Sequence, residues 1–254
     1  MFPLLYHNMR CINNQYGTII TNFKIFFMNQ LLVLSASVNY LDYLSFTYSL
    51  NKDLFKKYNL NYVIVTDYKD NETYNFCISN SINCYRTDAF YHFNGKDATF
   101  NRAGALNEFL KINTAYSSSW ILLLDSDIIL NEEIIDSFLK TNQANIFYGC
   151  GREFYLSYEN YQKNKHSGIE QCKHLGFFQL FNIEYLKKKY EELKLINYDY
   201  NNNIIISNYN VSAQDGLFAN LFPNKQSLGY VKHIGPPYKN WDGRITEQWN
   251  INQY

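Results

Sequence analysis

Two acidic residues, Asp125 and Asp127, stand on either side of Ser126 directly after the apolar run 120–124. Five consecutive apolar residues are typical of a buried strand, so the two carboxylates are expected at the carboxyl end of that strand. Oxygen ligands of this kind suit Mg²⁺ or Mn²⁺, ions that commonly bridge phosphate groups. Asp and Ser are also ordinary turn residues, so a turn without a ligand explains the same motif.

Two further apolar runs, 31–36 and 62–67, predict strands that carry polar residues at or near their ends. Ser35 lies near the end of the first run, and Asp67 ends the second. In open α/β sheets, ligands bind beyond the carboxyl ends of the strands. Ser35 and Asp67 are therefore candidate contacts for a nucleotide base and its ribose.

The pattern along the chain predicts an α/β domain with a mostly parallel central sheet that helices cover on both faces. The other elements that we expect are helices at about 40–57, 100–116 and 131–140, strands at about 144–148, 177–182 and 228–232, a helix from 183 to about 195, and a helix from about 214. Residues 28–254 form a single domain in this reading, with residues 1–27 as a loosely ordered extension.

Composition excludes some classes of protein. The 254 residues include 23 basic and 23 acidic side chains, and this balance argues against a nucleic-acid partner, because nucleic-acid binders usually carry basic excess. The apolar stretch near the N-terminus is interrupted by polar residues, so we expect no membrane span. Five scattered cysteines fit reduced thiols in a cytoplasmic protein.

Residues 99–107, Thr-Phe-Asn-Arg-Ala-Gly-Ala-Leu-Asn, precede the acidic motif. This segment resembles the Phe-Asn-Arg-Ala-x-x-Leu-Asn segment of the beta-1,4-galactosyltransferases and related, family-2-like inverting enzymes of the GT-A fold. The resemblance implies that Asn101 and Arg102 help to hold a sugar-nucleotide donor. A guanidinium also matches a diphosphate in charge and geometry, although an arginine that pairs at the surface is the simpler alternative.

Three later segments follow the order of the same family. The run 176–182 resembles its strand on the acceptor side, and Gln214-Asp215 stands where the family has an acidic pair that carries the catalytic base. The first acid of that pair is replaced by Gln214, and capping of a helix would also explain Asp215. His233 stands where GT-A enzymes bring a late histidine to the metal, although a lone histidine is often structural.

The resemblance implies a glycosyltransferase that uses Mn²⁺ (or Mg²⁺) and a nucleoside-diphosphate sugar, with inversion at the anomeric carbon. Asp127 and His233 would bind the metal. Asp125 would contact the metal or its water, or the ribose or sugar of the donor. Asp215 would act as the base toward an acceptor hydroxyl on a glycan, lipid or protein. Two other readings stay open: a sugar-nucleotide-binding or inactive relative, and a metal-dependent nucleotidyltransferase. The last normally has a glycine-rich, basic phosphate loop after its first strand, which the residues after Leu34 lack.

Overall fold

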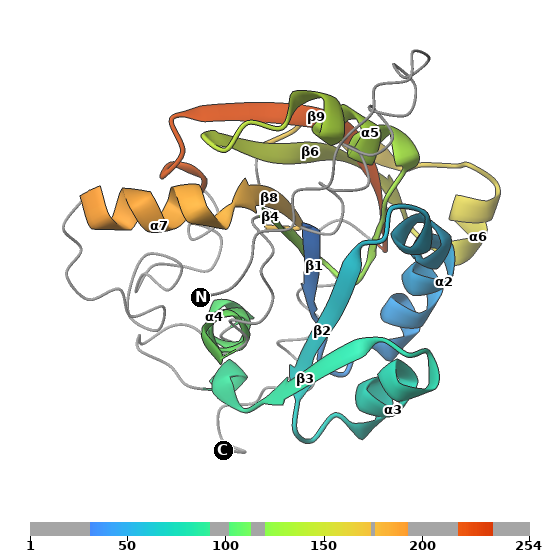
Figure 1. Cartoon of the computed structure of the whole chain (residues 1–254). Coiled ribbons are helices and arrows are strands. Elements are labelled where there is room, and N and C mark those ends of the chain that lie inside the picture. Colours follow the sequence, from blue (N-terminus) through green and yellow to red (C-terminus); the bar gives the residue numbers. More distant parts are fainter. Residues whose placement is uncertain (1–30, 92–101, 113–119, 174–175, 193–217, 236–254) are drawn as a thin grey trace, which may run out of the picture.

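The computed structural model describes residues 31–91, 102–112, 120–173, 176–192 and 218–235, and Figure 1 draws the remainder as a thin grey trace. The described elements are β1 (Leu31–Ala36), α2 (Leu41–Lys57), β2 (Asn61–Asp67), α3 (Asn71–Ser79), β3 (Asn83–Thr87), a 3₁₀ turn η1 (Ala89–Tyr91), α4 (Arg102–Ile112), β4 (Trp120–Leu124), β5 (Ile128–Ile129), α5 (Glu132–Thr141), β6 (Ile146–Tyr155), α6 (Tyr158–Gln162), β7 (Gly168–Glu170), β8 (Phe178–Asn182), α7 (Ile183–Glu192) and β9 (Asn224–Ile234). The expected extension, residues 1–27, lies outside the described ranges, so its boundary with the domain stays a prediction.

The first four long strands form the parallel half of the sheet, in the order β3-β2-β1-β4. Helix α2 connects β1 to β2, and α3 connects β2 to β3, as parallel neighbours require a crossover connection. In this arrangement the carboxyl ends of β1, β2 and β4 meet at one edge of the sheet. The α/β prediction is confirmed here, and the strands expected at 31–36, 62–67 and 120–124 all form.

Beyond β4 the strands run in both directions. Strand β8 is antiparallel to β4 and to β6, β9 is parallel to β6, and the short strands β5 and β7 pair antiparallel with β9 and β6. The nine described strands thus make one mixed sheet, and the expected parallel arrangement holds for its first half only. The physical reason is that this half lacks regular strand–helix alternation, and therefore the crossovers that keep neighbours parallel.

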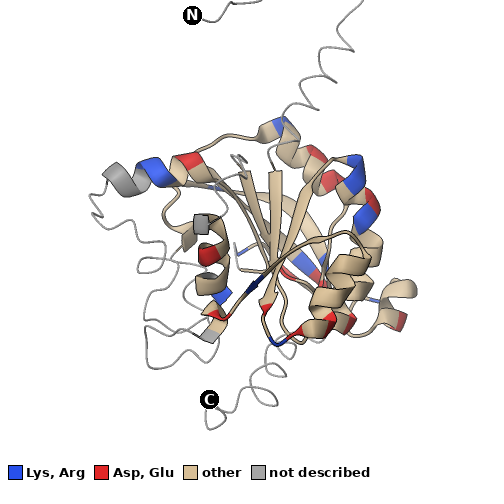
Figure 2. Cartoon of the chain, turned by 60° about the horizontal axis from the view of Figure 1, so that its bottom comes forward, with Lys and Arg blue, Asp and Glu red and all other residues tan. Residues whose placement is uncertain are grey.

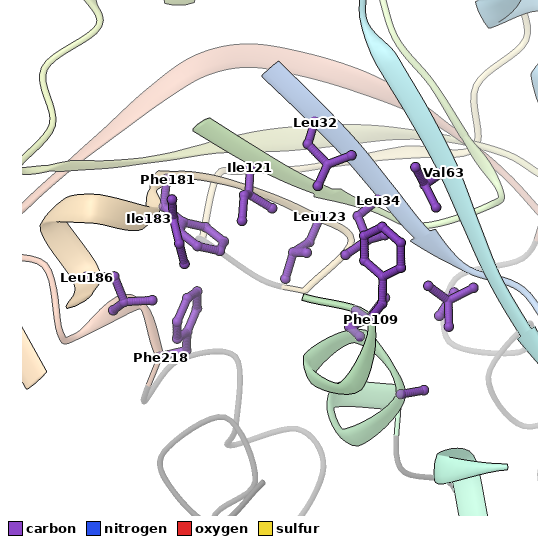
Figure 3. Packing of buried hydrophobic residues seen from close by; sticks show 14 of the residues in the cluster. Leu32, Leu34, Val63, Phe109, Ile121, Leu123, Phe181, Ile183, Leu186 and Phe218 are labelled. Atoms are coloured by element: carbon purple, nitrogen blue, oxygen red, sulfur yellow. The ribbon is translucent and has the colours of Figure 1, made fainter. Parts of the chain in front are cut away.

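Alternating side chains of the central strands fill two apolar layers. On β4, Ile121 and Leu123 face the layer that contains Phe109 of α4, Leu186 of α7 and Phe218, and Figure 3 shows these side chains packed together. The other side chains of β4 face α2 and α5. The buried strands are largely uncharged, and Figure 2 shows most of the coloured charged residues on the surrounding helices and near strand ends. A core on both faces holds the strand ends that carry the candidate site at fixed positions.

Helix starts are fixed by side chains that accept hydrogen bonds from free backbone N–H groups. Asp70 accepts a bond from the N–H of Thr73 (3.0 Å) at the start of α3, and Asn131 accepts one from the N–H of Ile134 (3.0 Å) at the start of α5. Across the described ranges, no helix combines the length and the apolar character that a membrane crossing needs.

Candidate active site

The turn that follows β4 is held by backbone hydrogen bonds on both sides. The N–H of Asp125 donates to the carbonyl of Phe177 (3.0 Å), and the carbonyl of Asp125 accepts from the N–H of Ile128 (3.2 Å). Between them, the Ser126 hydroxyl donates to the carbonyl of Ala36 at the end of β1 (3.2 Å). The two acidic side chains of this turn are directed to different partners.

Asp127 and His233, two of the residues predicted to bind a metal, lie close together. The Oδ2 atom of Asp127 lies 3.6 Å from Nε2 of His233, and their side chains are only 3% and 6% exposed. Pairing of β5 with β9 places them there, because His233 is opposite Ile128, the residue after Asp127. The N–H of Ile234 also donates to the Asp127 carbonyl (2.9 Å). A buried carboxylate beside an imidazole is a pair of ligand types that a divalent metal accepts.

Asp125 forms an ion pair with Arg102 instead of joining these two residues. An Nη atom of Arg102 lies 2.8 Å from Oδ1 of Asp125, and the two side chains are 20% and 26% exposed. Both Nη atoms of Arg102 also donate to the carbonyl of Gly176, at 3.1 and 3.2 Å. In the ranges that the structure describes, no group of three or more His, Cys, Asp and Glu side chains is arranged to hold a metal. Two of the three predicted ligands therefore face each other, and the third pairs with the arginine.

Asp67 and Ser35 occupy different environments. The Asp67 carboxylate is buried at the end of β2; one oxygen accepts from the N–H of Lys69, and the other has no hydrogen-bond partner among the described residues. Ser35 is fully buried on the side of β1 that faces α2. Burial raises the pKa of Tyr62, and the nearby Ser35 hydroxyl opposes that shift. Asp67 thus lies at the sheet edge with one oxygen that can accept a hydrogen bond, whereas Ser35 lies in the layer between β1 and α2.

Two predicted site residues lie outside the described residues. Asn101, the proposed donor contact, directly precedes α4, and Asp215, the proposed base, belongs to the range 193–217. Their roles stay predictions.

The structure adds residues that sequence reasoning missed, all on α2 or just before it. The Tyr40 hydroxyl donates to Oδ2 of Asp127 (3.0 Å), and the Thr47 hydroxyl donates to the Ser126 carbonyl (2.6 Å). Asn51 binds the backbone of the same segment twice, from Nδ2 to the carbonyl of Ile128 and from the N–H of Leu130 to Oδ1, both 2.9 Å. One signal was available, since Thr47 and Asn51 are polar residues a helical turn apart in the helix expected at 40–57.

The charge of the acidic turn also affects the pKa of Tyr43. Burial raises the pKa of Tyr43, and the charges of Asp127 and Asp42 raise it further. Its ring stacks on that of Tyr40, with centroids 4.5 Å apart. Tyr40 thus contacts the Asp127 carboxylate directly, and Tyr43 packs on Tyr40.

The sequence matches no protein-family model and no curated protein. Solved structures that resemble the chain include glucosyl-3-phosphoglycerate synthase from Mycobacterium tuberculosis, in complex with Mn²⁺, UDP and phosphoglyceric acid (11% identity, TM-score 0.46, 91% of this chain and 80% of that chain). Mannosyl-3-phosphoglycerate synthase from Rubrobacter xylanophilus gives 11% identity and a TM-score of 0.49 over 88% of this chain and 72% of that chain. A glycosyltransferase involved in glycosylation of the major capsid of PBCV-1 gives 14% identity and a TM-score of 0.32 over 78% of this chain and 81% of that chain.

The likeness to these three structures covers most of the chain at low sequence identity. Their likeness is distant, with TM-scores below 0.5, and says nothing about the activity of this chain. The case for an activity therefore depends on the geometry of the chain's own residues.

Proposed function

We propose that the chain is a glycosyltransferase that moves a sugar from a nucleoside-diphosphate sugar to an acceptor hydroxyl with the help of a divalent metal. The observation that carries this proposal is the buried Asp127–His233 pair, 3.6 Å apart, at the sheet edge where β4 ends. The carboxylate is on the turn after β4 and the imidazole is on β9, and Arg102 at the start of α4 pairs with Asp125 of the same turn.

The side chains present fit Mn²⁺ or Mg²⁺. Asp127 would supply a hard oxygen and His233 a ring nitrogen, and the diphosphate of the donor would complete the coordination, as is usual where the protein supplies few ligands. The Nε2 atom of His233 is the ring nitrogen that faces Asp127, and Nδ1 is buried without a hydrogen-bond partner within the described ranges. When bound, the metal would neutralise negative charge that grows on the leaving nucleoside diphosphate.

Arg102 would act beside the metal site. Its guanidinium already bridges Asp125 and the Gly176 carbonyl, so it is held in place before a ligand arrives. A pre-positioned guanidinium lowers the free-energy cost of binding a diphosphate. Asn101, which precedes it in the chain, is assigned to the same donor.

Asp67 and Ser35 are assigned to the nucleoside end of the donor. The buried Asp67 oxygen that has no partner among the described residues would accept a hydrogen bond from a base or ribose. Ser35 is the weaker assignment of the two, because it lies on the α2 side of β1.

Asp215 is assigned as the base. It would take the proton of the acceptor hydroxyl while that oxygen forms a bond to the anomeric carbon and the bond from this carbon to the diphosphate breaks. This displacement inverts the anomeric configuration. Determining the anomer of the product by NMR tests this step separately from the activity.

The test is a donor panel. The full chain is incubated with Mn²⁺ and each of several UDP-, GDP-, ADP- and CDP-sugars, and release of the nucleoside diphosphate is measured with Asp127→Asn beside it. A matched control is Asp136→Asn, since Asp136 is a carboxylate on α5 that accepts from Tyr58. We expect one donor to be turned over only with metal, with release on the order of 100-fold lower in Asp127→Asn and near normal in the control.

Two outcomes would contradict the proposal. Release that is independent of metal, or that survives in Asp127→Asn, would remove the metal from the mechanism. No release and no thermal stabilisation with any donor would favour a protein without transferase activity.

A further inference from the structure

We propose that Tyr40 is a positioning residue that orients the Asp127 carboxylate for its metal. This inference rests on the proposed function and extends it to a side chain that does not itself contact the metal. It concerns the affinity of the site for the ion, which can be measured without turnover.

The contact is direct and buried. The Tyr40 hydroxyl donates to Oδ2 of Asp127 at 3.0 Å, and Tyr40 and Asp127 are 8% and 2% exposed. Nε2 of His233 is 3.6 Å from the same oxygen. One carboxylate oxygen therefore faces both a hydrogen-bond donor and the imidazole. These two contacts restrict rotation of the carboxylate about the Cβ–Cγ bond of Asp127. Such supporting hydrogen bonds orient the carboxylates that ligate metals.

Tyr40 is itself held firmly. Its carbonyl accepts from the N–H of Leu44 (3.1 Å) as α2 begins, and its ring stacks on Tyr43 at an interplanar angle of 17°. The hydroxyl therefore cannot follow Asp127 if the carboxylate turns. A rigid donor restricts its acceptor to one orientation.

The rest of α2 holds the backbone that carries Asp127. Thr47 binds the carbonyl of Ser126, and Asn51 binds Ile128 and Leu130 on the other side of Asp127. The backbone on both sides of Asp127 is thus tied to the helix that begins next to Tyr40. The main chain is fixed by Thr47 and Asn51, and the remaining freedom of the Asp127 side chain is removed by Tyr40.

Tyr40→Phe tests this division of roles, because it removes the hydroxyl and keeps the ring and its stacking on Tyr43. The chain offers a matched control at the other end of α2. Tyr58 is 6% exposed and its hydroxyl donates to Oδ1 of Asp136 at 2.9 Å in a partly buried hydrogen bond, so Tyr58→Phe also deletes one hydroxyl that binds a carboxylate. Both variants should lose similar metal-free thermal stability.

Mn²⁺ affinity is measured by the electron paramagnetic resonance signal of the free ion, with Mn²⁺ alone and with Mn²⁺ plus each of UDP, GDP, ADP and CDP. We expect Tyr40→Phe to bind Mn²⁺ about 10- to 100-fold more weakly than the parent, and Tyr58→Phe to match the parent. The apparent KM for Mn²⁺ in donor turnover should shift by the same factor.

The possible failures are distinguishable. If the parent binds Mn²⁺ and Tyr40→Phe binds it equally well, the role of Tyr40 is overturned while the proposed function stands. Equal weakening in Tyr58→Phe would also overturn it, since the effect would then be one of general stability. If the parent binds no Mn²⁺ under any of these conditions, the inference fails together with the metal-dependent mechanism.

Discussion

At the scale of single residues, Arg102 connects three parts of the candidate site. It begins α4, forms an ion pair with Asp125 after β4, and binds the Gly176 carbonyl shortly before β8. The two side chains are at most about a quarter exposed, so water weakens this contact less than it would at an open surface. Arg102 is thus a structural contact as well as a candidate ligand for the diphosphate.

Replacing Arg102 should therefore affect stability as well as donor binding. We expect Arg102→Ala to lower the free energy of unfolding by about 1–3 kcal/mol, because Asp125 and the Gly176 carbonyl both lose their charged donor. Arg102→Lys should recover less than half of this loss, since one ammonium cannot reproduce the planar fork that reaches both acceptors. Urea unfolding measures both values. Equal stability of Arg102→Ala and the parent would show that the ion pair contributes nothing.

At this scale the sequence singles out residues through motifs, and the roles of these residues stay predictions. These motifs include Asp127 and His233, which are far apart in the sequence and which the fold brings together. The sequence prediction also grouped Asp125 with them, whereas the neighbouring arginine takes that carboxylate. Tyr40 gave no signal, because a tyrosine before a helix is compatible with any core. Which carboxylate the Tyr40 hydroxyl contacts depends on how the start of α2 packs against the turn after β4.

At the scale of elements, α2 fixes the acidic segment through Asn51. This side chain is 3% exposed, donates to the carbonyl of Ile128 and accepts from the N–H of Leu130. One of these backbone groups lies in the short strand β5 and the other directly follows it, and β5 carries few ladder bonds of its own. The position of β5 beside β9, and hence of Asp127 beside His233, depends on this contact.

Asn51→Leu should destabilise the protein strongly. The substitution keeps the side-chain volume similar but leaves one buried carbonyl and one buried N–H without their partner, and each costs about 1–3 kcal/mol. We expect a combined loss of about 2–5 kcal/mol in chemical unfolding. Asn80→Leu is the control, because Asn80 is exposed and its side chain donates to the Phe76 carbonyl of its own helix end. Similar losses in the two variants would contradict the assigned role of Asn51.

The β6–β7 pair contributes a contact that depends on pH. Nε of Arg152 lies 2.6 Å from Glu170, whose other oxygen is 3.3 Å from Lys173. Burial alone would raise the pKa of Glu170, but hydrogen bonds and charges from Arg152 and Lys173 outweigh it, so the pKa is lowered. A carboxyl with a lowered pKa stabilises the folded state above its unfolded pKa, and this contribution is lost as the pH falls through the folded pKa.

Glu170→Gln should therefore be less stable than the parent at pH 7 by about 1.5–3 kcal/mol. The difference should shrink below about pH 4, as the parent's carboxyl becomes protonated. Unfolding of both proteins by urea at pH 7 and at pH 3 measures the two differences. A difference that stays constant between these pH values would mean that the charge of Glu170 is not the source of the stabilisation.

Strands could be predicted from the sequence where their residues are apolar and buried. The strands expected at 31–36 and 120–124 match their observed bounds, whereas α3 and β3 were missed. Strand β3 lies at the sheet edge and has mainly polar or partly exposed residues, so its pattern lacks the apolar run of a buried strand.

The strand expected at about 144–148 is observed from Ile146 and continues to Tyr155, through the glycine at position 151. A Cβ at Gly151 would lie 2.5 Å from the ring of Tyr230 and 2.7 Å from the carbonyl of Glu170. This glycine permits close packing within the sheet, which the sequence pattern does not distinguish from a turn.

At the scale of the whole molecule, one mixed sheet brings the two halves of the chain to a common site. The parallel half supplies Asp67 and the acidic turn, and the mixed half supplies His233 on β9 (Figure 1). The α/β class followed from the regular alternation of the first half. The strand directions of the second half could not be predicted, because they depend on long-range pairings such as that of β8 with β4.

The most direct test of the central claim is a crystal structure of the full chain with Mn²⁺ and the nucleoside diphosphate that the donor panel selects. Anomalous scattering of manganese locates the ion independently of the coordinates proposed for it. We expect a single strong peak within coordination distance of an Asp127 oxygen and a His233 ring nitrogen, in contact with the diphosphate. A peak elsewhere, or nucleotide bound at the sheet edge with no manganese beside Asp127, would contradict it.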